Sequence, residues 1–133
     1  LSLPSPRYVC LLAWDARDVP ADAIACFARK LLDSGAVYVC TWGPDCERVH
    51  DIVDEEDVDL DLPEHLDGVV MTTWHSDKPL ADAIFFALLC SAPDEVYSAG
   101  CDSTIGISIG SAAWAEEIRA AFENPQAFLA DLP

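Results

Sequence analysis

Three segments of the sequence end an apolar run with a tryptophan and place an aspartate within three residues of it. They are residues 12–15, 40–45 and 72–77. An aromatic face attracts a cation through its quadrupole, and a carboxylate attracts it through its charge. The repeated pattern therefore indicates one recognition surface for Lys or Arg side chains. Its predicted residues are Trp14, Asp15, Trp42, Asp45, Trp74, His75 and Asp77.

The same pattern has a structural alternative. Each Trp can close the end of a strand over the helix that follows it, and each Asp can cap the N-terminus of that helix. The two roles can hold in one protein.

The segment from Asp45 to Asp67 concentrates negative charge. It contains eleven acidic residues and one basic residue, Arg48. Like charges at this density repel one another, and a cationic partner would offset the repulsion. We therefore predict an acidic loop over residues 54–67 that joins the binding surface, although a merely solvated loop is the alternative. The loop residues assigned to binding are Asp54, Glu55, Glu56 and Asp57.

Metal, nucleotide and nucleophile patterns are weak in this sequence. The acidic segment lacks the glycine and the ligand spacing of an EF-hand, and no Cys-x-x-Cys pair supports a zinc site at Cys40, Cys46 and His50. Residues 106–111 match neither phosphate-loop pattern. Cys101 and His75 would form a nucleophile and a base only if their strands approached each other. The sequence therefore predicts no cofactor, no metal and no catalytic residue.

The pattern of apolar residues predicts an α/β fold. Apolar strands alternate with amphipathic helices, as a parallel sheet covered on both faces requires. Only residues 100–103 separate the last two predicted strands, which favours an antiparallel hairpin at a sheet edge. We expect a three-layer open sandwich with a mostly parallel sheet of about five strands, in a single domain over residues 1–133 that begins with an extended segment, 1–6. Strands are predicted at 8–13, 36–41, 68–73, 95–99 and 104–110, and helices at 21–32, 44–53, 79–91 and 112–122.

The lack of a recognisable targeting signal and the positions of the cysteines favour a cytoplasmic location. The N-terminal residues lack the basic and apolar regions of a secretory signal. The longest apolar run, residues 80–92, contains Asp82 and is too short for a membrane span. Four of the six cysteines lie in apolar runs, where a free thiol acts as a small hydrophobic group.

Composition limits the function. The 133 residues include 24 acidic and 7 basic residues, for a net charge of −17, and 52% are hydrophobic. The hydrophobic fraction excludes a disordered chain, and the charge excludes direct binding to nucleic acid or to anionic membranes. We expect a small acidic binding protein that engages a basic protein partner, for example an inhibitor or immunity protein against a toxin or nuclease. The alternatives are a small enzyme at the carboxyl edge of the sheet that acts on a cationic small molecule, and a nucleic-acid mimic; the oligomeric state stays open.

The positions of the cysteines give a first testable prediction. Thiol titration of the protein, denatured without reductant, should detect close to all six cysteines, because most of them lie in apolar elements rather than at paired loop positions. A result corresponding to three disulfides would contradict both the free thiols and the cytoplasmic location.

Overall fold

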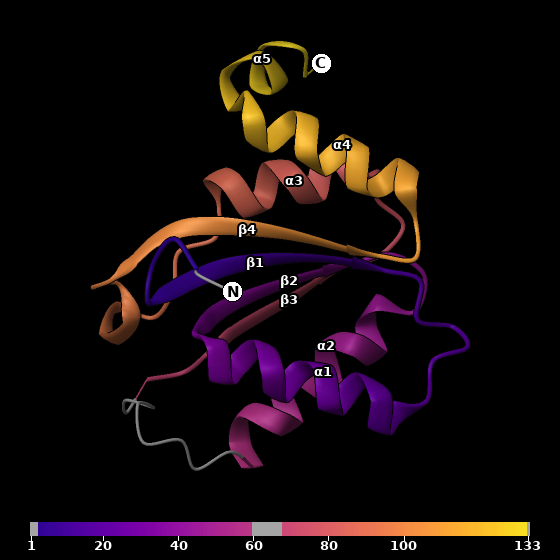
Figure 1. The fold of residues 1–133 in the computed structure, drawn as a ribbon, viewed down its shortest axis with the longest axis vertical. Helices are drawn as coiled ribbons and strands as arrows, with labels where there is room; N and C mark the ends of the chain where they lie inside the picture. The colour runs from indigo at the N-terminus through magenta and orange to yellow at the C-terminus, as the bar shows by residue number, and fades with distance from the viewer. Residues whose placement is uncertain (1–2, 60–67, 133) are drawn as a thin grey trace.

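The computed structural model describes residues 3–59 and 68–132. Strands, helices and one 3-10 helix, η1, follow one another along the chain (Figure 1). In chain order they are β1 (Arg7–Trp14), α1 (Ala21–Ser34), β2 (Ala36–Trp42), α2 (Cys46–Asp59), β3 (Met71–His75), α3 (Leu80–Leu89), η1 (Glu95–Tyr97), β4 (Cys101–Ile109), α4 (Ala112–Glu123) and α5 (Pro125–Ala130).

The described strands form one parallel sheet in the order β3-β2-β1-β4. Helices α1 and α2 lie on one face of it, and α3 and α4 on the other (Figure 1). Every residue of β1 after Arg7 is buried, because the strand has a neighbour on each side and a helix layer on each face. The predicted α/β fold with three layers is confirmed.

The predicted fifth strand and antiparallel hairpin are not found in the described part of the chain. Residues 95–99, predicted as a strand, contain η1, and β4 runs parallel to β1. The Asp94 carboxylate accepts hydrogen bonds from the backbone N–H groups of Val69 at 2.9 Å and Val96 at 3.0 Å, which holds the turn. Tyr97, 2% exposed, packs with Leu32, Val37 and Val70. Its burial explains why strand-forming residues occur in a turn, and α3 supplies the crossover between β3 and β4.

Helix α2 replaces the first part of the predicted acidic loop 54–67. It continues to Asp59, beyond the predicted end at residue 53. Val49 and Val53, one helical turn apart and each 1% exposed, fix it to the core. Near its end Arg29 of α1 donates a hydrogen bond to Glu56 at 2.7 Å. Residues 60–67 of the predicted loop lie outside the described residues.

Two smaller features complete the fold. In the predicted N-terminal segment 1–6, of which residues 1–2 lie outside the description, Ser5 is buried and its hydroxyl contacts the Ser103 hydroxyl. Helix α4 covers β4 closely, since a Cβ added to Gly106 would lie 2.3 Å from Ile118 Cγ2. No helix in the described ranges has the length and apolar character needed to cross a bilayer.

The assignment of Tyr97 to the core can be tested against its neighbour. Tyr97→Ala should lower the free energy of unfolding by about 3–5 kcal/mol, because it removes a large buried aromatic ring. Val96→Ala should cost less than about 1.5 kcal/mol, because Val96 is 42% exposed. Urea unfolding of both variants measures the difference. Equal costs would contradict the burial of Tyr97 and would suit an edge strand.

Candidate functional site at the carboxyl edge of the sheet

The carboxyl edge of the sheet brings the predicted site residues together, but on two faces. Ala13 pairs with Trp42, and Trp42 pairs with His75, whereas Trp74 pairs with Thr41. Because successive side chains of a strand point to opposite faces, Trp42 and His75 lie toward α3 and α4. Trp74 lies on the opposite face, beside α2, as does Trp14 beside α1. The single recognition surface predicted from the three Trp segments is therefore divided.

Trp14 is part of the core. It is 8% exposed, and its ring packs edge-on against Phe27 with centroids 5.4 Å apart. Asp15 forms a bidentate ion pair with Arg17, with N···O distances of 2.9 and 2.6 Å. These hydrogen bonds from Arg17 lower the pKa of the Asp15 carboxyl. For Trp14 the structural alternative therefore describes the observed position.

A cavity of about 460 Å³ lies where β2 and β3 end. Four predicted residues line it: Trp42, Asp45, His75 and Asp77. The Trp42 indole N–H donates to the backbone oxygen of Lys78 at 2.7 Å. Its ring meets Trp114 edge-on, with centroids 4.9 Å apart. This carboxyl-edge cavity thus has an aromatic wall and carboxylates at its rim.

Trp114 and Lys78 line the cavity but were not among the predicted site residues. The sequence predicts the helix that carries Trp114, but its place at this edge depends on β4 lying parallel to β1. Ser111 caps α4 by accepting the Trp114 backbone N–H at 3.2 Å, and this helix follows the end of β4. A residue in the first turn of such a helix stands at the carboxyl edge by the same topology as the other three Trp segments.

Asp45 and Asp77 occupy corresponding corners of the cavity. Both have positive φ, 67° for Asp45 and 57° for Asp77, a region in which Asp is enriched among non-glycine residues. Asp77 does not cap α3, since the N-cap position is Pro79; α1 likewise begins after Pro20 rather than after a capping Asp15. The capping alternative is therefore wrong for Asp15 and Asp77.

His75 lines the cavity and is partly buried there. Its Nε2 lies 2.9 Å from the Thr73 hydroxyl, and its ring centroid lies 4.7 Å from that of Phe86. Burial lowers the pKa of His75 below its ordinary value of 6.5, which favours the neutral imidazole.

Cys101 and His75 do not form a catalytic pair. Cys101 begins β4 whereas His75 ends β3, and in a parallel sheet the beginning and end of strands lie at opposite edges. Burial, and then Asp102, raise the pKa of the Cys101 thiol, which disfavours the thiolate. Burial also raises the pKa of Cys40 to about 12. In residues 3–59 and 68–132 no three His, Cys, Asp or Glu side chains cluster as metal ligands would.

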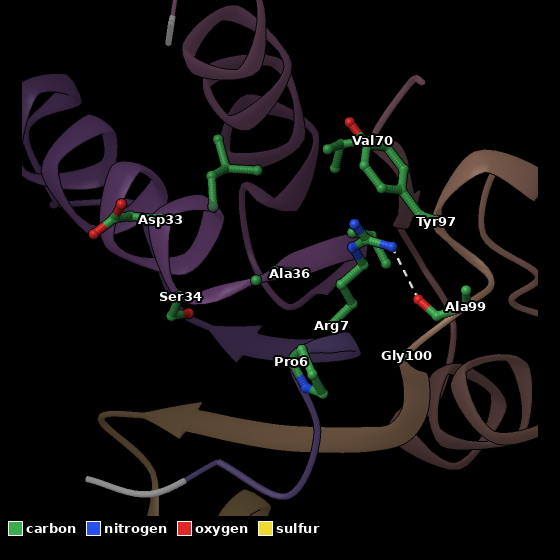
Figure 2. Close-up of a pocket in the computed structure, with 12 residues that line it drawn as sticks. Pro6, Arg7, Asp33, Ser34, Ala36, Val70, Tyr97, Ala99 and Gly100 are labelled. Atoms are coloured by element: carbon green, nitrogen blue, oxygen red, sulfur yellow. Dashed lines mark hydrogen bonds between the residues drawn. The ribbon is translucent and has the colours of Figure 1, made fainter. Parts of the chain in front are cut away.

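A second cavity, of about 580 Å³, lies at the amino edge of the sheet (Figure 2). It contains none of the predicted site residues. Arg7 crosses it, donates to the backbone oxygen of Ala99 at 2.9 Å and lies 5.4 Å from the centroid of the Tyr97 ring. These contacts hold the segment before β4 against β1, which is a structural role for Arg7.

Trp74 and helix α2 form a second, exposed part of the site. The Trp74 side chain is 47% exposed, and its ring lies 4.6 Å from that of His50. His50 Nδ1 lies 2.8 Å from an Asp51 oxygen, and Asp54 accepts a hydrogen bond from Thr72 at 2.7 Å. We call Trp74, His50, Asp51 and Asp54 the Trp74 patch. It joins an accessible aromatic ring to two carboxylates.

The four loop residues assigned to binding separate into two pairs. Asp54 and Glu55 are exposed on α2. Glu56, with a side chain 13% exposed, is occupied by Arg29, and Asp57 is half-buried. A helix presents positions 54 and 55 outward and turns positions 56 and 57 toward the protein, which a loop would not require.

Arg48 links the loop after β1 to the loop after β2 at the carboxyl edge. Its guanidinium donates to the backbone oxygens of Ala16 at 2.6 Å and Val19 at 2.8 Å, and to the Asp45 carboxylate at 2.8 Å. The loops also approach at Gly43, whose φ is +119° and where an added Cβ would lie 2.4 Å from the Trp14 backbone oxygen. Arg48 and Gly43 therefore set the position of Asp45 at the cavity rim.

Comparison with known proteins gives a family without an assigned activity. Residues 1–125 match the family model described as Domain of unknown function (DUF7684). No curated protein and no solved structure matches the chain.

The Arg48 contacts predict a local cost in stability. Arg48→Met should lower the free energy of unfolding by about 2 kcal/mol or more, because it removes three hydrogen bonds that a charged donor makes to two backbone oxygens and a carboxylate. Arg119→Met removes the same charge from an exposed pair of ion pairs on α4 and should cost less than about 1 kcal/mol. Urea unfolding compares the two variants. A cost for Arg48→Met no larger than that of its control would contradict the linking role.

Proposed function

We propose that this chain, which belongs to the DUF7684 family of domains of unknown function, is a small acidic binding protein whose partner is a basic protein. The observation that carries the proposal is the Trp74 patch. Its large aromatic ring is 47% exposed, and the patch combines that ring with two carboxylates. An Arg or Lys side chain laid over such a ring gains both cation–π attraction and an ion pair.

The outer face of α2 extends the patch. Its exposed acidic side chains recur at helical spacing, so they form a stripe along one side of the helix. We call this set the acidic stripe: Glu47, Asp51, Asp54 and Glu55. With a net charge of −17 behind it, the stripe would attract a basic surface over roughly a Debye length, about 8 Å at physiological ionic strength.

The carboxyl-edge cavity lies next to the patch and would receive a second group of the partner. Cys46, the first residue of α2, places its sulfur 3.6 Å from the Ser76 hydroxyl in the loop after β3. The start of α2 therefore contacts a loop that lines the cavity. Asp77 and the aromatic wall of Trp42 and Trp114 suit a partner side chain that has a polar end and an apolar stem.

An inhibitor or immunity protein is the specific form of this proposal. Toxins and nucleases that act on nucleic acid carry basic active sites, because they must neutralise phosphates. An acidic protein that covers such a site associates rapidly through electrostatic steering and is then held by aromatic anchors. The enzyme alternative has no comparable support, because Cys101 and His75 lie at opposite edges of the sheet.

Association kinetics test the acidic stripe. The immobilised protein should retain a basic protein from an extract of its source organism at low salt; with that partner identified and purified, association and dissociation rates can be measured. The triple change Glu47→Gln, Asp51→Asn and Glu55→Gln should slow association and flatten its salt dependence, while dissociation changes little. The control Glu95→Gln, Glu117→Gln and Asp131→Asn removes the same amount of charge at exposed positions away from α2. Equal slowing in both variants would contradict local steering by α2.

Dissociation kinetics test the aromatic anchor. Trp74→Ala should speed dissociation and cost about 2 kcal/mol or more of binding free energy, as a central aromatic contact does. Trp74→Phe should recover part of that loss, because the ring face remains. A Trp74→Ala variant that keeps its fold by circular dichroism and binds as tightly as the original protein would overturn the proposed site.

A further inference from the structure

Strand β4 is a long edge strand of the described sheet, and the N-terminal segment contacts it through the side chains of Ser5 and Ser103. Strand β4 has nine residues, and β1 is its one neighbour among the described strands. An edge strand presents a row of N–H and C=O groups that can pair with another strand, and proteins usually protect it with Lys, Pro or short length. Neither Lys nor Pro occurs in β4, and Asp102 is its one charged residue. The opposite edge, β3, has only five residues.

The sequence along this edge is unusually free of charge. Residues 103–115 contain no Asp, Glu, Lys or Arg, although 23% of the chain is charged. The centre of a protein–protein interface is depleted of charged residues in the same way. Ile105, Ile107 and Ile109 are half-buried and pack on the hydrophobic cluster beneath α1, so one face of β4 adds an incompletely covered apolar strip.

We propose that β4 pairs with β4 of a second copy of this chain, in antiparallel orientation across a two-fold axis. Residues directly opposite one another in such a pair share a face of the sheet. With the axis at Gly106, Ile105 lies opposite Ile107 of the second copy, which continues the apolar strip from one copy into the other. Asp102 lies opposite Gly110 of the second copy, so the two Asp102 carboxylates do not lie opposite each other.

The absence of charge favours a second copy over the basic partner as the occupant of β4. A basic protein gains nothing from a neutral strand, whereas two chains of net charge −17 can approach each other only where no carboxylates stand opposite one another. The Trp74 patch belongs to β3 and α2, and β3 is the other edge strand of the described sheet. Pairing through β4 therefore leaves the acidic stripe and the patch of both copies accessible. The dimer and the proposed function use different surfaces, so each can be tested without the other.

Charge exchange tests both the strand and its register. Thr104 would face Ser108 of the second copy, so Thr104→Glu with Ser108→Glu sets carboxylates opposite each other at both ends. Thr104→Lys with Ser108→Lys does the same with ammonium groups. By sedimentation equilibrium at physiological ionic strength, the unmodified protein should be a dimer and each double variant a monomer. An equimolar mixture of the two variants should form dimers again, because every opposed pair is then attractive.

The control adds the same charge away from β4. Ala23→Glu with Gln126→Glu, both at exposed positions, should leave the dimer intact. A monomeric unmodified protein, a dimeric double-Glu variant, a monomeric control or a mixture that stays monomeric would each overturn the proposal. Should a double variant fail to fold, hydrogen exchange of the unmodified protein decides the question. Protection of β4 amides must rise with protein concentration, and protection independent of concentration would contradict the pairing.

Discussion

Strand β1 is the constraint on which the rest of the structure depends. It pairs in parallel with β2 on one side and β4 on the other, and helices cover both of its faces. All described strands consequently end at one edge, and the pairing register decides to which layer each terminal side chain belongs. Trp42 and His75 fall in one layer, and Trp14 and Trp74 in the other. The division of the site into a cavity and an exposed patch is a result of this alternation, not of any property of the Trp residues themselves.

Charged side chains are distributed unevenly over the described elements. Glu56 of α2 and Asp45 in the loop before it form ion pairs with Arg29 and Arg48, respectively. The exposed acidic side chains of α2 form the acidic stripe, whose mutual repulsion a basic partner would relieve. Strand β4 carries almost no charge at all. The described chain thus has three regions of different electrostatic character, and each suits a different kind of contact.

Several parts of this arrangement could be predicted from the sequence, because they depend on local pattern. The parallel strands that end at Trp14, Trp42 and His75, and the helices after them, follow from continuous apolar runs and helical spacing. The register could not be predicted, because whether Trp42 pairs with Ala13 or with Trp14 changes no local pattern yet reverses the face of the side chain. Residues 95–99 carry strand-forming side chains, but Tyr97 is buried in the core and the Asp94 carboxylate accepts hydrogen bonds from two backbone N–H groups. In both cases a tertiary contact outweighs local propensity.

The carboxyl-edge cavity shows the same limit. Asp45 and Asp77 were found from their spacing after a Trp, whereas Trp114 belongs to a segment with no such spacing. Its place depends on the topology alone, since β4 returns to lie beside β1 and delivers the start of α4 to the same edge. Functional residues that are assembled by connectivity need the strand order before they can be recognised.

The position of β1 also has a consequence for how the chain is made. On the ribosome, β1 emerges first and meets β2 within one helical crossover, since Tyr8 pairs with Ala36. The residues that pair with its other side, such as Ser103, are synthesised only after two further crossover segments. Until then the nascent sheet presents an apolar strand edge to the cell, the kind of surface that folding intermediates shield or lose to aggregation. Any fragment that ends before Ile109 lacks the strand that completes β1, so the smallest piece of this chain that contains the whole described sheet must reach that residue.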